Sequence, residues 1–310
     1  MSNIILHHYP MSPFAEKVRL ILGFKKLAWD SVIIPMYMPK PDVVALTGGH
    51  RRTPFMQIGA DVYCDSNLIC DVLEHIAPTP TLYPEAVKGA ARIVAHWADT
   101  LVFPTAMAYN FQPAGAAHVL ASWSPEDVKA FVQDRTTMRG GAPRMLAADA
   151  IGMYKSYLRR LSHMLEQGPF LLGDAPSVAD FSAYHPTWYT LRQVPNLAEI
   201  FDATPNMREW LLRMESFGHG THCDISSTQA IQTAHDSQPI DISQESFIDH
   251  HGIALGSQVV ITADAFGLEP TAGELVAATR TRYTVRRQDP RAGTVQVHFP
   301  RVGFILKKAE

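Results

Sequence analysis

The stretch of sequence that decides the fold runs from residue 9 to residue 19 and reads YPMSPFAEKVR. It follows a short apolar run, residues 4–6, which is typical of a buried strand. Ser12 can cap a helix, and Pro13 is tolerated at the first helical position, so we expect a helix to begin there. Apolar residues then recur at helical spacing as far as Leu22. The sequence therefore predicts a strand followed directly by an amphipathic helix.

The rest of residues 1–80 continues this alternation of strands and helices. A second strand is predicted at 31–34, and a connection rich in proline follows it. Residues 53–58 and 62–64 read as two strands of a hairpin around a turn that contains glycine. Ser66 then opens another helix. The order predicts an α/β unit in which helices cover a sheet.

Residues 84–218 have helical patterns and no convincing strand, so we expect a second, all-helical domain. Ile151, Tyr154, Leu158, Leu161 and Leu165 form one apolar stripe. In residues 177–180, a serine is followed three positions later by Asp180, which predicts a capping box that locks the next helix and costs about 1 kcal/mol to remove. Residues 124–143 are polar and contain glycine, and are predicted to be a mobile excursion between helices.

The pattern changes again after residue 219. Residues 226–250 are rich in Ser, Gln, Asp and His, as a linker would be. Five short strands are then expected, with a turn at residues 289–293. Strands this short and closely spaced favour a small antiparallel barrel or an open sheet. We therefore expect residues 225–310 to form a small appended β-rich domain.

Composition excludes several classes of protein. The chain has 310 residues, of which 46% are hydrophobic and 18% charged, and its formal net charge is 27 − 30 = −3. This balance favours neither nucleic acid nor an anionic membrane as a partner, and the eight basic residues of 280–308 read as a solvated strand face. There is no apolar run of 18 residues and no signal-peptide pattern, and three scattered cysteines suit the cytoplasm. No metal is expected, because residues 219–224 hold metal-capable side chains at compressed spacing.

Four motifs, in this order and spacing, resemble the glutathione S-transferase family: residues 9–19, Thr53-Pro54, Asp65-Ser66 and residues 177–180. The resemblance covers about residues 1–218. It implies a thioredoxin-like N-terminal domain that binds glutathione, followed by the helical second domain. Residues 225–310 have no counterpart in ordinary members of the family.

The resemblance gives Ser12 the central chemical role. A free thiol has a pKa of about 8.5, so it needs preferential stabilisation of the thiolate to be ionised at neutral pH. A serine hydroxyl at a helix start donates a hydrogen bond to sulfur, and the helix dipole adds positive potential. The plain alternative for Ser12 is a helix cap, and Tyr9 is the alternative hydroxyl for the thiol.

The other expected site residues also come from the resemblance. Pro54 is expected to follow a cis peptide bond, with Thr53 holding the cysteinyl part of glutathione. Ser66 and Asp65 are expected to hold the γ-glutamyl end. Further expected contacts are Phe14 and Arg52 for glutathione, with solvated loop charges as the alternative reading of Arg51 and Arg52, and Tyr109 and Phe111 for the electrophile, with ordinary core aromatics as the alternative.

The function implied is that of a glutathione-dependent transferase, in which glutathione is the co-substrate and the second substrate is a small electrophile. The alternative is a non-catalytic binding protein that keeps the scaffold and uses its C-terminal β region for a partner. A homodimer is expected from the resemblance, although the added region could block or replace that contact.

Overall fold

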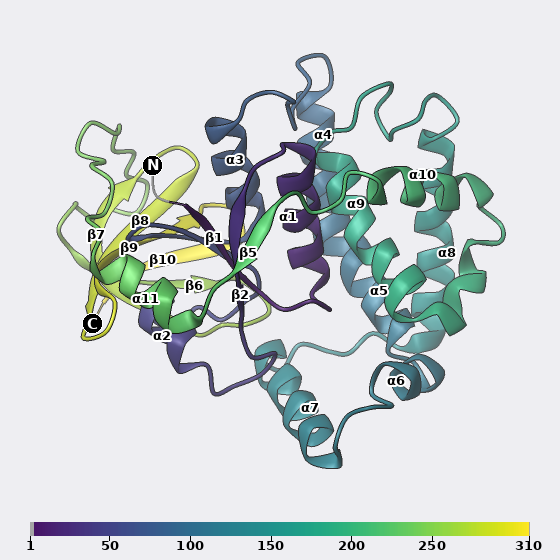
Figure 1. Ribbon diagram of the computed structural model, residues 1–310, viewed down its shortest axis with the longest axis horizontal. Helices are drawn as coiled ribbons and strands as arrows, with labels where there is room; N and C mark the ends of the chain where they lie inside the picture. Colours follow the sequence, from purple (N-terminus) through teal and green to yellow (C-terminus); the bar gives the residue numbers. More distant parts are fainter. Residues whose placement is uncertain (1–2, 310) are drawn as a thin grey trace.

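Strands from residues 4–64 and from residues 222–308 form one ten-stranded sheet, and a helical bundle lies beside this sheet (Figure 1). The computed structural model describes residues 3–309. The strand order is β10-β6-β7-β8-β9-β4-β3-β1-β2-β5. The strands are β1 (Ile4–His8), β2 (Trp29–Ile33), β3 (Phe55–Ile58), β4 (Asp61–Cys64), β5 (His222–Asp224), β6 (Gln258–Ala263), β7 (Thr271–Ala278), β8 (Arg282–Asp289), β9 (Gly293–Pro300) and β10 (Phe304–Lys308).

The N-terminal unit has the thioredoxin-like arrangement expected from the sequence. Strand β1 pairs in parallel with β2 and antiparallel with β3, and β3 and β4 form the predicted hairpin. Its helices are α1 (Pro13–Phe24), α2 (Pro41–Thr47) and α3 (Ser66–Ile76). Ser12 caps α1 and Pro13 is its first residue, as predicted. The start of α1 therefore lies at the end of the central strand β1.

The helical domain follows, and none of its helices within residues 3–309 is long and apolar enough to cross a lipid bilayer. Its helices are α4 (Lys88–Trp97), η1 (Ala98–Val102), α5 (Phe103–Asn110), α6 (Pro113–Val119), α7 (Pro125–Arg139), α8 (Ala147–Met164), α9 (Val178–Trp188), η2 (Tyr189–Gln193), η3 (Pro195–Phe201) and α10 (Pro205–Glu215).

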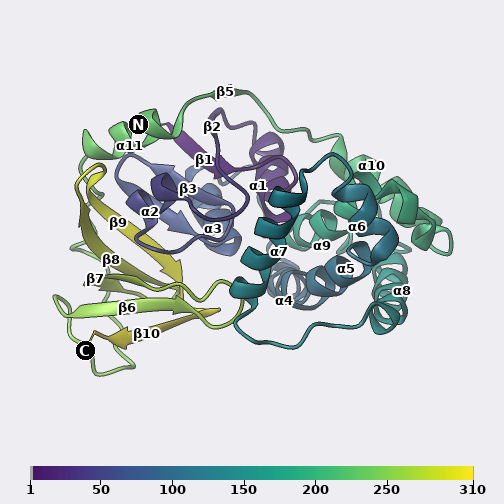
Figure 2. The same cartoon turned by 90° about the horizontal axis from the view of Figure 1, so that it is seen from below.

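The prediction of a mobile excursion at residues 124–143 is wrong, because most of this stretch is the helix α7. Ser124 caps it by accepting a hydrogen bond from the main-chain N–H of Asp127, and Gly140 ends it in the left-handed conformation. These end signals are in the sequence, but the helix carries no strong apolar stripe to reveal it. Figure 2 shows α7 standing in front of the junction between the sheet and the bundle.

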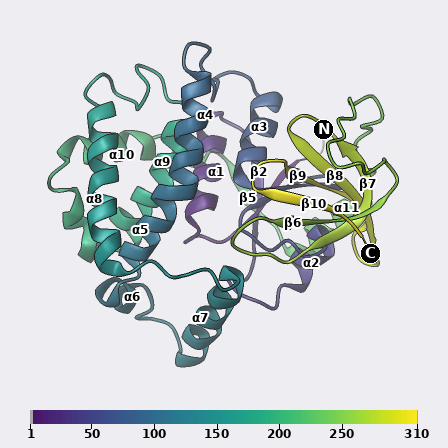
Figure 3. The ribbon, with the colours of Figure 1, turned by 180° about the vertical axis from the view of Figure 1, so that it is seen from behind.

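The C-terminal strands continue the N-terminal sheet, and they form an open sheet, one of the two forms expected. Strand β9 pairs in parallel with β4, so that Val62 lies opposite Val297. Apolar residues from both halves share one core, among them Ile5, Phe55 and Val285. Seen from behind (Figure 3), the N-terminal unit lies between the helical bundle and strands β6–β10. The expected appended domain is thus joined to the first domain by a sheet and a core.

Part of the stretch predicted as a linker, residues 226–250, forms a helix. Just before it, strand β5 pairs in parallel with β2, at the opposite end of the sheet from β10. Helix α11 (Ser227–His235) follows and packs against α2 and β9. Ser226 and Gln229 form a capping box at its start, which is the local signal that the sequence prediction overlooked.

The capping box predicted at residues 177–180 is confirmed. The buried carboxylate of Asp180 accepts hydrogen bonds from the main-chain N–H of Ser177 at 2.9 Å and of Leu171 at 2.8 Å. It also accepts from the indole of Trp210 at 3.1 Å. Asp180 therefore ties the start of α9 to α10 and to the preceding loop as well as capping a helix.

We expect Asp180→Ala to lower the free energy of unfolding by about 3 kcal/mol, because three buried donors lose their acceptor. This exceeds the 1 kcal/mol expected of a cap alone. Urea denaturation checks the value, with Ser124→Ala as a control at an exposed cap that should cost about 1 kcal/mol. Equal losses in the two variants would show that the contacts to Trp210 and Leu171 contribute nothing.

Candidate functional site

The first candidate residue, Ser12, lies at the start of α1. Its Oγ accepts a hydrogen bond from the main-chain N–H of Ala15 at 3.3 Å, and its own N–H donates to the carbonyl of Tyr9 at 3.1 Å. The hydroxyl is thus where a helix dipole would favour an anion. However, Ser12 is only 2% exposed. A ligand thiol reaches this hydroxyl only if neighbouring groups move.

The second candidate feature is the step into β3. The peptide bond between Thr53 and Pro54 is cis, as expected from the sequence. The buried hydroxyl of Thr53 has no hydrogen-bond partner within residues 3–309. Thr53 therefore has an unsatisfied polar group at the position predicted to hold the cysteinyl part of glutathione.

The third candidate feature is the start of α3. Asp65 has a left-handed main chain, with φ of 78°, and its carboxylate accepts the N–H of Asn67 at 2.8 Å. Burial raises the pKa of Asp65. Ser66 is 5% exposed, and its Oγ accepts a hydrogen bond from Lys17 Nζ at 3.3 Å. Because Oγ accepts from lysine, the hydroxyl proton of Ser66 is free to be donated to a ligand.

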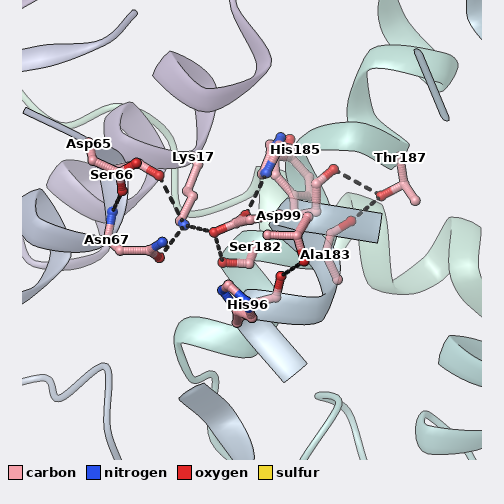
Figure 4. A network of polar contacts seen from close by, with 12 residues as sticks. Lys17, Asp65, Ser66, Asn67, His96, Asp99, Ser182, Ala183, His185 and Thr187 are labelled. Atoms are coloured by element: carbon pink, nitrogen blue, oxygen red, sulfur yellow. Dashed lines mark hydrogen bonds and ion pairs between the residues drawn. The ribbon is translucent and has the colours of Figure 1, made fainter. Parts of the chain in front are cut away.

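A buried polar network joins Ser66 to the helical domain (Figure 4). The fully buried Lys17 places Nζ 2.8 Å from Asp99 Oδ2 in η1. Asp99 also accepts from His185 Nε2 of α9 at 3.0 Å and from Ser182 Oγ at 3.4 Å. The network thus connects α1 and α3 of the first domain to η1 and α9 of the second.

The charges of this network support one another. Burial alone would raise the pKa of Asp99, but Lys17 and His185 hold it below its usual value. Burial alone would lower the pKa of Lys17, but Asp99 raises it. Sequence reasoning missed this pair because its members are 82 residues apart and no local pattern connects them.

A second group of charges lies next to Thr53, and it corrects the reading of Arg51 as a solvated loop charge. Arg51 is 3% exposed and forms ion pairs with Asp134 of α7 and, at 2.5 Å, with Glu269. Arg52 Nε donates to the carbonyl of Phe266 at 2.5 Å. Arg51 therefore contacts α7 and residue 269, and Arg52 contacts residue 266.

Lys40, which the sequence analysis did not single out, lies beside this group. It is 3% exposed, and within residues 3–309 its amine makes no hydrogen bond or ion pair. Burial, together with the charges of Arg135 and Arg51, lowers its pKa to about 8. Its amine lies 6.0 Å from the centre of the Tyr9 ring. A cation at this position attracts anionic ligand groups.

The remaining predicted residues lie in different surroundings. The hydroxyl of Tyr9 accepts a hydrogen bond from Arg135 of α7 at 3.4 Å. Phe14 is half-buried against the rings of Phe103 and His185, next to the Lys17 network.

The two residues predicted to line an electrophile pocket have side chains in different surroundings. Tyr109 is buried in the helical core, where its hydroxyl donates to the carbonyl of Leu197 at 2.8 Å. Phe111 is half-buried and stacks on Phe131 of α7 and on Tyr189. Only Phe111 therefore faces α7, and the placement of Tyr109 matches the alternative reading as a core aromatic. Within the described part of the chain, no three metal-capable side chains gather to hold an ion.

We expect Lys17→Met to lower the free energy of unfolding by about 3 kcal/mol or more at pH 7, because it leaves the Asp99 carboxylate buried without its cation. Chemical denaturation checks this. The control is Lys88→Met, which removes an exposed lysine paired with Glu85 and should cost less than about 1 kcal/mol. A loss as small as that of the control would contradict this account of the pair.

The same variant has a predicted pH dependence. In the wild type the pKa of Asp99 is below its ordinary value of 3.8, so its contribution is complete above that value and is lost as the pH falls further. Without Lys17, burial instead favours the protonated acid. We therefore expect the stability deficit of Lys17→Met to be largest at pH 7 and to shrink as the pH approaches about 4. Denaturation curves at several pH values test this, and a constant deficit would refute it.

Comparisons with known proteins agree with the fold. The family model described as "Glutathione S-transferase, N-terminal domain" matches residues 6–81, and the model for the C-terminal domain matches residues 144–213. The protein called "FtsZ-localized protein A" from Caulobacter vibrioides is 25% identical over 194 residues, which is 57% of this chain and 73% of that protein.

Solved structures are also similar. A glutathione S-transferase from Rhodospirillum rubrum F11 is 21% identical, covers 69% of this chain and 88% of its own, and has a TM-score of 0.50. A GST-like protein from Pseudomonas syringae is 40% identical over 100% of both chains, with a TM-score of 0.81. That likeness includes the C-terminal strands. The chain therefore belongs to the glutathione S-transferase family.

Proposed function

We propose that this protein binds reduced glutathione and activates its thiol for attack on a small electrophile. The observation that carries the proposal is the contact between α1 and the start of α3. Lys17, on the helix that Ser12 caps, donates to Ser66 and so places two helix starts beside one another. Helix starts attract anions, and glutathione in its reactive form carries both carboxylates and a thiolate.

Each end of the ligand would meet a different helix start. The hydroxyl proton of Ser66 and the first N–H groups of α3 would receive the γ-glutamyl carboxylate, with Asp65 near the ammonium. The thiol would lie at Ser12. Lowering its pKa from about 8.5 to 7 takes about 2 kcal/mol of preferential stabilisation of the thiolate. Ser12 would donate a hydrogen bond to the sulfur, and the sulfur is the nucleophile that displaces a leaving group or adds to the electrophile.

One observation favours a second candidate function, a non-catalytic interaction protein. The Ser12 hydroxyl is buried and already accepts a hydrogen bond within its own helix. A relative found by sequence bears the name FtsZ-localized protein A, which describes where a protein is found and no reaction. In this case the scaffold would be retained for binding a partner. Homodimerisation and a cytoplasmic location remain predictions in both cases.

We expect Ser12→Ala to keep the affinity for glutathione within about threefold and to slow conjugation about 10- to 100-fold, because it removes one hydrogen bond to the thiolate. Titration calorimetry with reduced glutathione and a spectrophotometric conjugation assay measure the two effects. The control is Ser226→Ala, since Ser226 caps α11 in the same way.

The outcomes separate the two candidates. Full activity of Ser12→Ala would remove Ser12 from the mechanism, and Tyr9→Phe would then be the next variant. If the wild type shows no binding of glutathione, the enzyme proposal fails and the interaction protein is favoured.

A further inference from the structure

Three parts of the chain that are distant in sequence meet at Arg51. Arg51 precedes β3, Asp134 lies on α7, and Glu269 lies in the loop of residues 264–270 that connects β6 to β7. We call Arg51, Asp134 and Glu269 the Arg51 junction. Within it, Arg51 of the N-terminal unit pairs both with the helical domain and with the loop between the C-terminal strands.

The loop of residues 264–270 makes further contacts with both neighbours. The main-chain N–H of Gly267 donates to the carbonyl of Met138, near the end of α7, at 2.7 Å. The carbonyl of Phe266 accepts from Arg52. Figure 2 shows this loop extending from β6 to the lower end of α7. The loop therefore holds α7 through its main chain as well as through Glu269.

Helix α7 also contacts Tyr9 and the segment of residues 36–38. Arg135 donates to the carbonyl of Met36 at 2.8 Å and to the hydroxyl of Tyr9 at 3.4 Å. Asp134 accepts the N–H of Met38 at 3.2 Å. The carbonyl of Tyr9 in turn accepts the N–H of Ser12. A continuous set of contacts thus leads from the loop, through α7, to the residue predicted to meet the thiol.

The charges around the junction indicate that replacing Glu269 would disturb it, because Glu269 compensates nearby cations. Lys40, Arg51 and Arg135 lie close to the carboxylates of Asp134 and Glu269, and Arg52 is also within reach of Glu269. Loss of the Glu269 charge would remove a carboxylate that faces several of these cations. Because Arg51 is buried, that imbalance acts at low effective dielectric, where repulsion between like charges is strong.

We propose that the loop of residues 264–270 supports the glutathione site by holding α7 in place. In this proposal Glu269 is a positioning residue that acts on α7 through Arg51. The inference rests on the proposed function and deepens it, because it gives the C-terminal strands a role at that site. Since the loop belongs to those strands, it would make ligand binding in this chain depend on residues 258–310.

Two measurements on the full chain test the proposal: hydrogen exchange of the α7 amides without ligand, and the dissociation constant of reduced glutathione by calorimetry. We expect Glu269→Gln to accelerate exchange in α7 about tenfold and to weaken glutathione binding about fivefold. The matched control is Glu274→Gln, because Glu274 pairs with the exposed Arg286 on β8 and makes no contact with the junction. The control should change neither quantity.

A second variant tests the main-chain contact without changing a charge. Gly267 has φ of +73°, and a Cβ there would lie 3.0 Å from Met138 Cε and 3.3 Å from Arg52 Cγ. Gly256 has φ of +84°, and a Cβ there meets nothing within 4 Å. Both replacements by alanine strain the main chain, but only Gly267→Ala places that strain and a tight side-chain contact in the loop that binds α7. We expect faster exchange in α7 for Gly267→Ala alone.

The outcomes are distinct. Unchanged exchange of α7 in both Glu269→Gln and Gly267→Ala would overturn the proposal, as would faster exchange with unchanged glutathione affinity. If the wild type does not bind glutathione, the proposed function fails and with it the loop's role at that site. The exchange measurements would then still decide whether the loop holds α7.

Discussion

A buried ion pair between Lys17 and Asp99 joins the N-terminal unit to the helical domain. Removing two charges from water costs several kcal/mol each, so such a pair is kept only when its groups are well satisfied. Here Asp99 also accepts from His185 and Ser182, and Lys17 also donates to Ser66. The same contacts that satisfy the charges fix α1 and α3 against the helical domain. The pair therefore sets the position of the hydroxyl that would receive the glutamyl end of a ligand.

The second constraint is that both ends of the N-terminal sheet are covered. Exposed edge strands invite pairing with other chains. In this chain β9 pairs with β4, and β5 pairs with β2 after the chain has left the helical domain. Through the first of these pairings, β6 and β7 are carried to the side of the molecule where α7 meets the N-terminal unit. The appended strands thus complete the sheet and also bring residues 264–270 next to the candidate site.

The features that sequence reasoning predicted correctly have local signals. Ser12 with Pro13 and the Ser177–Asp180 cap each depend on a few adjacent residues, whereas the cis bond before Pro54 is expected from the family resemblance. Helices α7 and α11 also have local caps, but polar composition outweighed these signals in the prediction. The contacts of Lys17 with Asp99 and of Arg51 with Glu269 join distant residues, as does the parallel pairing of β4 with β9. No local periodicity encodes such contacts, so they emerge only from the packed fold.

The most direct test of this account is a double-mutant cycle on glutathione binding. The dissociation constant of reduced glutathione would be measured by calorimetry for the wild type, Lys17→Met, Ser66→Ala and the double variant. If Lys17 acts by placing the Ser66 hydroxyl, the double variant should bind about as weakly as the weaker single variant, with a coupling energy of about 1 kcal/mol or more. Additive losses, or the absence of binding by the wild type, would contradict the account.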